Sequence, residues 1–206
     1  IELDYIAKDL TSNKIFDLTS EEEAKKNSIY NQKAEYTPII ICIGERQVIR
    51  GLDEFLIGKE MNKEYAIGIK PEDGFGKKDP KLIKIIPLKV FKKQNIQPFP
   101  GLQINIDNFM GTIITISGGR VLVDFNHPLA SHDLEYKIKI NRLITDNKKK
   151  IESLLSFLGK LSISTEKGLA TIEVDLPEVL QKEIKERIKK LIPSIKEVQF
   201  KNKNQK

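Results

Sequence analysis

The chain is poor in the residues on which most redox, metal and hydrolytic sites depend. Its 206 residues include one cysteine, two histidines and no tryptophan. One cysteine cannot form an internal disulfide, and two histidines without a cysteine cluster are too few ligands for a transition-metal site. The phosphate-binding glycine loop, the serine nucleophile elbow and the zinc-protease helix motif are also missing from the sequence. The sequence therefore predicts no cofactor and no metal, disfavours kinase and hydrolase chemistry, and is typical of a reducing cytoplasm.

Long hydrophobic runs are missing as well. No stretch of 18 apolar residues occurs, so the sequence predicts no membrane-spanning helix. The first ten residues, IELDYIAKDL, alternate and carry charges, unlike a signal peptide. The run Ile39–Ile43 is short and rich in β-branched residues, which predicts a fully buried strand with Cys42 as a small core residue.

Positive charge is concentrated at one end of the chain. The net charge is +6, and residues 147–206 contain 14 Lys and Arg against 8 Asp and Glu, so this segment carries the whole excess. One interpretation is a solvated linker, a helix face and a charged tail. Another is affinity for an anionic surface such as ribosomal RNA. The segment could equally pair through a sheet edge to form a homodimer, and the sequence alone does not choose.

Hydrophobic periodicity predicts an α+β protein. Alternation predicts strands at Glu2–Asp9, Glu64–Lys70 and Leu134–Leu143, and Ser20 with Glu23 predicts a helix that runs to about Asn27. The middle of the chain is rich in strands. Its predicted elements are strands at 81–86, 102–106, 110–117 and 120–125, a short helix at 87–93 and a tight hairpin at Gly118-Gly119. The end of the chain predicts a helix at 147–158 and a β-α-β unit at 169–176, 177–191 and 195–201.

Two short segments point to a shallow apolar pocket. Val48-Ile49-Arg50-Gly51 is predicted to end a strand and pass into a helical turn, in which Leu52, Phe55 and Leu56 share one face. In Pro71–Gly76, two glycines flank Phe75, and the loop is predicted to present this ring outward. An apolar pocket lined by such elements suits an extended peptide better than a charged metabolite.

These segments resemble the FKBP-type peptidyl-prolyl cis-trans isomerases, in which a twisted antiparallel sheet wraps a short helix. The family's pocket positions fall in order on residues of this chain. The resemblance implies the catalytic residues Tyr5, Asp17, Phe75 and Tyr136 and a substrate-binding wall of Phe16, Ile39, Val48, Ile49, Leu52 and Leu129. Two positions depart from the family pattern. Leu52 stands where the pocket floor is often tryptophan, and Phe75 lacks the hydroxyl of the usual tyrosine.

A block of about fifty residues identifies the branch within this family. It lies between Gly76 and the segment Asn126–Ala130, which is similar to the family's return motif and in which His127 is expected to brace the loop by hydrogen bonds. The block resembles the insert-in-flap chaperone domain of SlyD-like isomerases, and the long C-terminal segment resembles that of long archaeal members. The histidine-rich tail of some SlyD proteins is absent, so a nickel role is not implied.

The resemblance implies three domains and a function for the chain. Residues 1–77 and 127–146 would form the isomerase domain, residues 78–126 (the insert) a small β-rich chaperone domain, and residues 147–206 a small basic α/β domain. The predicted function is isomerisation of X-Pro bonds in unfolded or nascent polypeptides, with client binding by the insert. The alternative is a chaperone that binds chains on the same fold with little isomerase activity.

Overall fold

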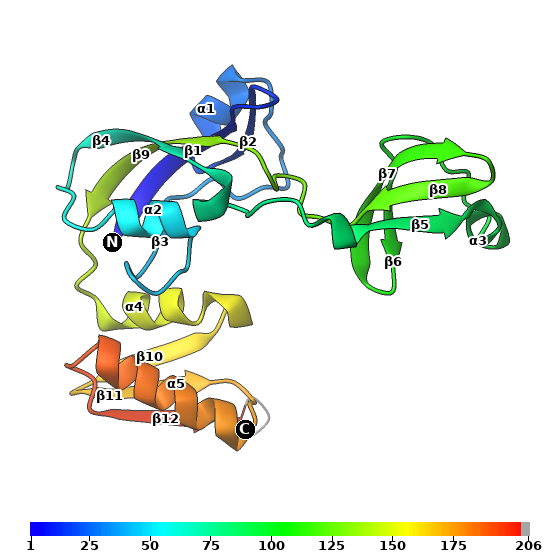
Figure 1. The fold of residues 1–206 in the computed structure, drawn as a ribbon. Helices are drawn as coiled ribbons and strands as arrows, with labels where there is room; N and C mark the ends of the chain where they lie inside the picture. The colour runs from blue at the N-terminus through cyan, green and yellow to red at the C-terminus, as the bar shows by residue number, and fades with distance from the viewer. Residues whose placement is uncertain (203–206) are drawn as a thin grey trace. The chain divides into compact units, whose positions relative to one another are not determined.

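The computed structural model of the protein describes residues 1–202, and contacts within it divide the chain into two compact units (Figure 1). The first unit contains residues 1–8, 14–68 and those from 135 onward, and the second contains residues 9–13 and 69–134. Two of the lysines in the predicted basic tail, Lys203 and Lys206, lie outside the described residues. Within the described part of the chain, no helix has both the length and the apolar character needed to cross a membrane.

The first unit is built on a five-stranded sheet in the order β2-β1-β9-β4, with β3 paired to β1. The strands are β1 (Glu2–Asp9), β2 (Lys14–Leu18), β3 (Ile39–Ile40), β4 (Glu64–Ile69) and β9 (Leu134–Arg142). Alternate residues of β9 are buried because successive side chains of a strand point to opposite faces: Leu134, Tyr136, Ile138 and Ile140 all lie in the core. The three long strands predicted from alternation are therefore confirmed.

Two short helices belong to the same unit, α1 (Glu21–Lys26) and α2 (Arg50–Phe55). The Ser20 hydroxyl oxygen accepts a hydrogen bond of 3.3 Å from the Glu23 amide, which confirms the predicted cap. The helix begins at Glu21, directly after this cap, and Asp17 and Leu18 belong to strand β2.

Two predictions for the segment before α2 are wrong. Strand β3 covers only Ile39 and Ile40, both half-buried, and Cys42 is half-buried rather than a core residue. Val48 and Ile49 do not end a strand but lie in a bend that leads directly into α2. The β-branched run overstated the strand because its backbone pairing ends at Ile41, which exchanges hydrogen bonds with Ile1.

The second unit contains a four-stranded antiparallel sheet in the order β5-β8-β7-β6. Its strands are β5 (Ile83–Pro87), β6 (Gln103–Ile106), β7 (Phe109–Ser117) and β8 (Arg120–Asp124), and the short helix α3 (Leu88–Lys93) follows β5. One face carries a core around Phe91, Ile113, Val121 and Val123. Gly118 and Gly119 both have positive φ, at 55° and 72°, as the predicted tight hairpin requires.

The chain ends in a three-stranded sheet covered by helices. Its elements are α4 (Asn147–Leu154), β10 (Ser162–Glu166), β11 (Leu169–Glu173), α5 (Glu178–Leu191) and β12 (Glu197–Lys201). Strands β11 and β12 are parallel, so the predicted β-α-β unit is confirmed. Strand β10, which the sequence analysis missed, pairs antiparallel with β11. We call the segment from α4 to β12 the C-terminal lobe. Its buried cluster includes Ile151, Leu154, Ile163, Ile172 and Ile188.

Candidate active site

Three adjacent strands of the first unit bring four of the predicted site residues together. Tyr5 lies on β1, Phe16 and Asp17 on β2, and Tyr136 on β9. The rings of Tyr5 and Tyr136 have centroids 5.8 Å apart, and the ring of Phe16 meets Tyr136 edge to face at 6.2 Å. These three rings form a continuous apolar wall, because offset and edge-to-face pairs are the favoured aromatic arrangements.

The hydroxyl of Tyr5 gives this wall a polar edge. It donates a hydrogen bond of 2.6 Å to Oδ2 of Asp17, whose side chain is exposed. Burial and then this hydrogen bond raise the pKa of Tyr5 well above its ordinary value of 10. Burial and the nearby Asp17 charge raise the pKa of Tyr136 to about 12. Both phenols therefore stay protonated at neutral pH, and the Tyr5 hydroxyl remains a donor.

The predicted apolar residues around α2 lie in the same unit. Ile39 stands opposite Leu3 of β1, Val48 and Ile49 are half-buried in the bend, and Leu52 is almost fully buried on α2. Ile49 is the residue that precedes α2, and its carbonyl oxygen accepts hydrogen bonds from the first turn of the helix. The start of α2 thus fixes the backbone of the residues predicted to line the pocket.

A buried carboxylate that the sequence analysis missed fixes the preceding loop. Oδ1 of Asp53 accepts the Gly44 amide at 2.9 Å, and Oδ2 accepts the Arg46 amide at 3.0 Å. The two loop residues have positive φ, 86° and 54°, a conformation that is uncommon for a residue such as arginine. Asp53 is 4% exposed, so it is a structural carboxylate on the buried side of α2. No sequence signal separates it from an ordinary surface acid.

The other two predicted site residues, Phe75 and Leu129, belong to the second unit. The ring of Phe75 is stacked on the ring of His127, with centroids 4.1 Å apart and planes 3° from parallel. Nδ1 of His127 accepts the Leu129 amide at 3.2 Å, which confirms that this histidine braces the return loop. Burial lowers the pKa of His127, so the ring stacked on Phe75 is neutral at pH 7. The stacking itself was not predicted.

A second buried carboxylate, also missed, lies in this unit. Asp9 accepts hydrogen bonds from the amides of Thr11 and Ser12 and contacts Nδ1 of His132 at 3.0 Å. Burial acts to raise the pKa of Asp9, but the hydrogen bonds from Ser12, Thr11 and His132 outweigh it and lower the pKa to about 2. Asp9 is therefore ionised at neutral pH and holds the turn that follows β1.

Comparison with known proteins finds two matching families and several relatives. Residues 2–92 match the family described as FKBP-type peptidyl-prolyl cis-trans isomerase, and residues 84–129 match the family described as FKBP26, IF domain. A short-type peptidyl-prolyl cis-trans isomerase of Methanocaldococcus jannaschii is 36% identical over 140 residues, which are 68% of this chain and 88% of that protein.

Two bacterial relatives carry the name FKBP-type peptidyl-prolyl cis-trans isomerase SlyD. The protein of Haemophilus influenzae is 29% identical over 53% of this chain and 57% of its own length. The protein of Vibrio cholerae is 28% identical over 66% of this chain and 67% of its own length. With 36% identity to the archaeal relative over 88% of that protein's length, the chain belongs to the FKBP-type peptidyl-prolyl cis-trans isomerase family.

Proposed function

We propose that the chain catalyses cis-trans isomerisation of X-Pro bonds in unfolded or nascent polypeptides. The observation that carries this proposal is the wall of Tyr5, Phe16 and Tyr136 with the Tyr5–Asp17 hydrogen bond at its edge. Rotation about an X-Pro bond is slow because amide resonance must be lost, with a barrier of about 20 kcal/mol. No nucleophile and no proton transfer is required, so a largely apolar site suffices.

The aromatic wall lowers this barrier by favouring the twisted imide over the planar one. The twisted form has a smaller charge separation, so it gains more from an apolar surface than the planar form does. The wall also fixes the proline ring on one side of the rotating bond. In this proposal Ile39, Val48, Ile49 and Leu52 complete the apolar surface, and Phe75 and Leu129 are further residues that contact the substrate.

We consider two alternative roles for the Asp17 carboxylate. Its carboxylate can interact with the carbonyl carbon of the twisted imide, or it can act only by orienting the Tyr5 hydroxyl, which it accepts at 2.6 Å. Phe75 has no hydroxyl to donate to a bound carbonyl. Its contribution is therefore apolar contact, held by the stacked His127 ring.

A short X-Pro peptide tests the proposal directly. We expect the wild-type chain to accelerate cis-to-trans isomerisation and the combined change Asp17→Ala and Phe75→Ala to lower kcat/KM strongly while the far-UV circular dichroism stays native. Phe157→Ala is the matched control, because Phe157 is an aromatic residue of the C-terminal lobe that is 69% exposed. Undiminished catalysis in the combined variant would overturn the assignment of the pocket. No catalysis in the wild type would favour the alternative of a binding-only chaperone.

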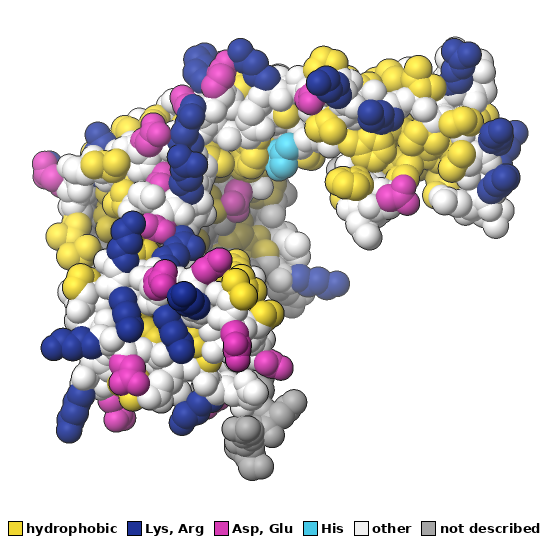
Figure 2. Space-filling model, turned by 60° about the horizontal axis from the view of Figure 1, so that its bottom comes forward, with side chains coloured by type: hydrophobic (Ala, Val, Ile, Leu, Met, Phe, Trp, Pro, Cys, Tyr) yellow, Lys and Arg dark blue, Asp and Glu magenta, His cyan; other side chains and the backbone are white. Residues whose placement is uncertain are grey.

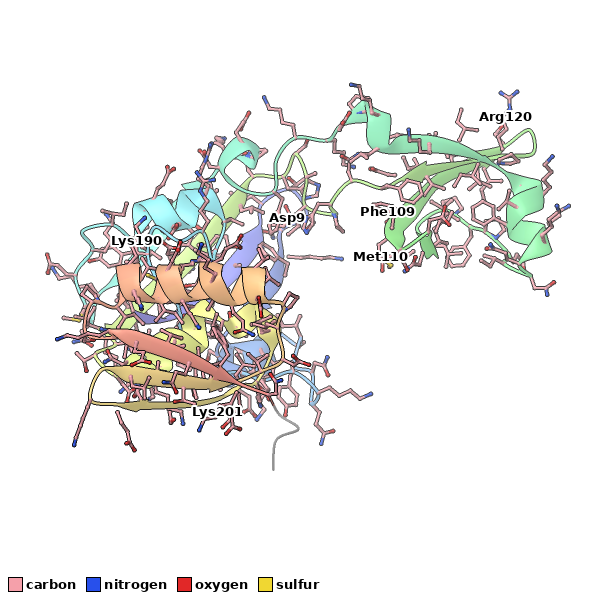
Figure 3. All side chains as sticks on the ribbon, turned by 90° about the horizontal axis from the view of Figure 1, so that it is seen from below. Asp9, Phe109, Met110, Arg120, Lys190 and Lys201 are labelled. Atoms are coloured by element: carbon pink, nitrogen blue, oxygen red, sulfur yellow. The ribbon has the colours of Figure 1, made fainter. Side chains whose placement is uncertain are left out.

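We further propose that the chain divides into the isomerase domain (1–77 and 127–146), the insert (78–126) and the C-terminal domain (147–206), and that the insert binds unfolded clients. Its support is apolar surface: Phe109 is 69% exposed, Ile85 is 62% and Met110 is 58%. Figure 2 shows hydrophobic side chains gathered over this part of the chain. In Figure 3, Phe109 and Met110 lie at one end of the sheet and Arg120 at the other. Exposed apolar surface on this scale is typical of an interaction site.

Substitution of the exposed residues Phe109 and Met110 tests whether peptide isomerisation and client binding are separate activities. We expect Phe109→Ser combined with Met110→Ser to leave isomerisation of a short peptide unchanged and to slow the proline-limited refolding of a denatured protein. The matched control is Phe157→Ser, which removes an equally exposed aromatic outside the insert. Equal loss of both activities, or no loss of either, would contradict client binding by Phe109 and Met110.

The partner of the C-terminal domain stays a prediction with two alternatives. Ribosome association through its lysines would give binding that collapses between low and moderate salt. A homodimer would give a mass that is twice that of the chain and independent of salt. We expect the protein to act in the cytoplasm under either alternative.

A further inference from the structure

The loop that leads into α2 is tied to the C-terminal lobe by the side chain of Gln47. Its Oε1 accepts the Cys42 amide at 2.6 Å, so the side chain closes the loop across five residues. Its Nε2 donates to the carbonyl oxygen of Ser153 on α4 at 2.6 Å, over a sequence separation of 106 residues. One amide group thus holds the shape of the loop and joins it to the lobe at the same time.

Two further contacts surround this link. The Ser153 hydroxyl donates to the carbonyl oxygen of Ile40 on β3 at 2.6 Å. Arg187 of α5 reaches Glu45 with Nη2 at 2.7 Å and Nε at 2.9 Å from Oε2. The Arg187 and Glu45 side chains are 44% and 24% exposed, so water screens this ion pair in part. The lobe is therefore bonded to Ile40 of β3, to Glu45 in the loop and to Gln47.

The residues bonded to the lobe lie next to the proposed pocket wall in the sequence. Gln47 is followed by Val48 and Ile49, which are half-buried and lead into α2. From the other side, Asp53 of α2 accepts the amides of Gly44 and Arg46. The loop is thus fixed between α2 and the lobe. If the bonds to the lobe were lost, only the bonds to α2 would fix the loop that leads to Val48.

Apolar contacts and polar links both join the loop to the lobe. Cys42 packs against the buried cluster of the C-terminal lobe. Beside it lies an open pocket of about 340 Å³, whose lining includes Ile40, Cys42, Ile144, Ser153 and Leu154. Apolar contacts therefore fill the junction only in part, and the hydrogen bonds of Gln47 and Ser153 and the Glu45–Arg187 pair also hold the loop on the lobe.

We infer that the C-terminal lobe is a positioning element for the isomerase pocket, with Gln47 and Glu45 as the positioning residues. They do not touch the substrate; they hold Val48 and Ile49 where the proline ring would pack. This inference rests on the proposed function of that wall. It gives the lobe a role in catalysis that is independent of any RNA or second copy that it binds.

Two sets of variants of the full chain test the inference. Gln47→Met keeps the size of the side chain and removes both hydrogen bonds. Arg187→Glu places two like charges together, and Arg187→Glu combined with Glu45→Arg restores the pair with reversed sign. Lys160→Glu is the matched control, because Lys160 of the lobe pairs at 3.4 Å with Glu35, which lies outside the loop that leads into α2. The side chains of Lys160 and Glu35 are 94% and 78% exposed.

Catalysis is measured with a short X-Pro peptide, well below the unfolding temperature of every variant. We expect Gln47→Met and Arg187→Glu each to lower kcat/KM by about fivefold, a size usual for coupling through a contact network. The reversed pair should recover most of the loss, and Lys160→Glu should equal the wild type. A purely structural role would lower the unfolding temperature and leave kcat/KM of the folded protein unchanged, and that result would overturn the inference.

A second readout keeps this inference separate from the proposed function. Methyl resonances of Val48 and Ile49 report the position of the wall whether or not the chain catalyses anything. We expect them to shift in Gln47→Met and Arg187→Glu, to return in the reversed pair, and to stay unchanged in Lys160→Glu. Unshifted methyl resonances would refute the inference even in an active enzyme. Shifted resonances in a chain without catalysis would support it and overturn only the proposed function.

Discussion

The hydrogen bond between Tyr5 and Asp17 allows the two possible roles of Asp17 to be told apart. Tyr5→Phe removes only the donor hydroxyl, and Asp17→Ala removes only the acceptor, which lies 2.6 Å away. A hydrogen bond to a charged group contributes about 1.5–3 kcal/mol. Because Asp17 is exposed and screened by water, we take a lower value of about 1 kcal/mol. If the bond orients the hydroxyl in the transition state, Tyr5→Phe lowers kcat/KM by about fivefold.

The assay is a double-mutant cycle on kcat/KM for a short X-Pro peptide. If Asp17 acts only by holding the Tyr5 hydroxyl, the combined variant is no worse than either single variant, with a coupling energy of about 1 kcal/mol. If Asp17 also acts on the imide carbonyl, Asp17→Ala costs more than Tyr5→Phe, and the two losses multiply. Unchanged catalysis in Tyr5→Phe would refute the reasoning, because the hydroxyl would then play no part.

The remaining predictions concern pH and stability. Because the pKa of Tyr5 is raised above 10, kcat/KM should stay flat from pH 7 to about 9.5; a fall centred below pH 9.5 that Tyr5→Phe abolishes would contradict this. Asp9, with its pKa lowered from 3.8 to about 2, stabilises the fold above pH 4 and loses this effect as pH falls through 2. Urea unfolding should show Asp9→Asn less stable by roughly 1–2 kcal/mol at pH 7, with a difference that shrinks below pH 4; a constant difference would rule this out. Gly111→Ala should destabilise the insert by about 1–3 kcal/mol, since its Cβ would lie 2.7 Å from Val123 and 2.8 Å from Phe125, and should spare peptide isomerisation. An unchanged melting curve for Gly111→Ala would show that the sheet relaxes.

Sequence patterns predicted those parts of the fold that depend on local periodicity. Strands β1, β4 and β9, the Ser20 cap and the glycine hairpin follow from alternation, capping and turn chemistry, each read within a few residues. The run Ile39–Ile43 misled because its β-branched residues report burial by any neighbour, whereas only its first three residues pair with the backbone of residues 1–3.

The candidate site was predictable only in part, for a physical reason. Tyr5, Phe16, Asp17 and Tyr136 could be named because the family resemblance supplied their order, and the structure brings them together. Asp53 and Gln47 could not be named, because their partners are backbone amides and a carbonyl that carry no residue identity. The partner of Gln47 lies 106 residues away, beyond any local pattern.

The order of strands in the main sheet has a consequence for how the chain is made. Strand β9 pairs with both β1 and β4, yet it follows the insert in the sequence. During synthesis, β1 and β4 are therefore complete while their shared neighbour is still missing. Two of the three strand pairings in the insert, β6–β7 and β7–β8, are sequence-adjacent hairpins, whose short loop closures favour fast folding, while β5 pairs with β8 over a longer separation. A newly made chain would thus fold the insert, with its exposed apolar side chains, before the main sheet that contains Tyr5 and Tyr136 is complete.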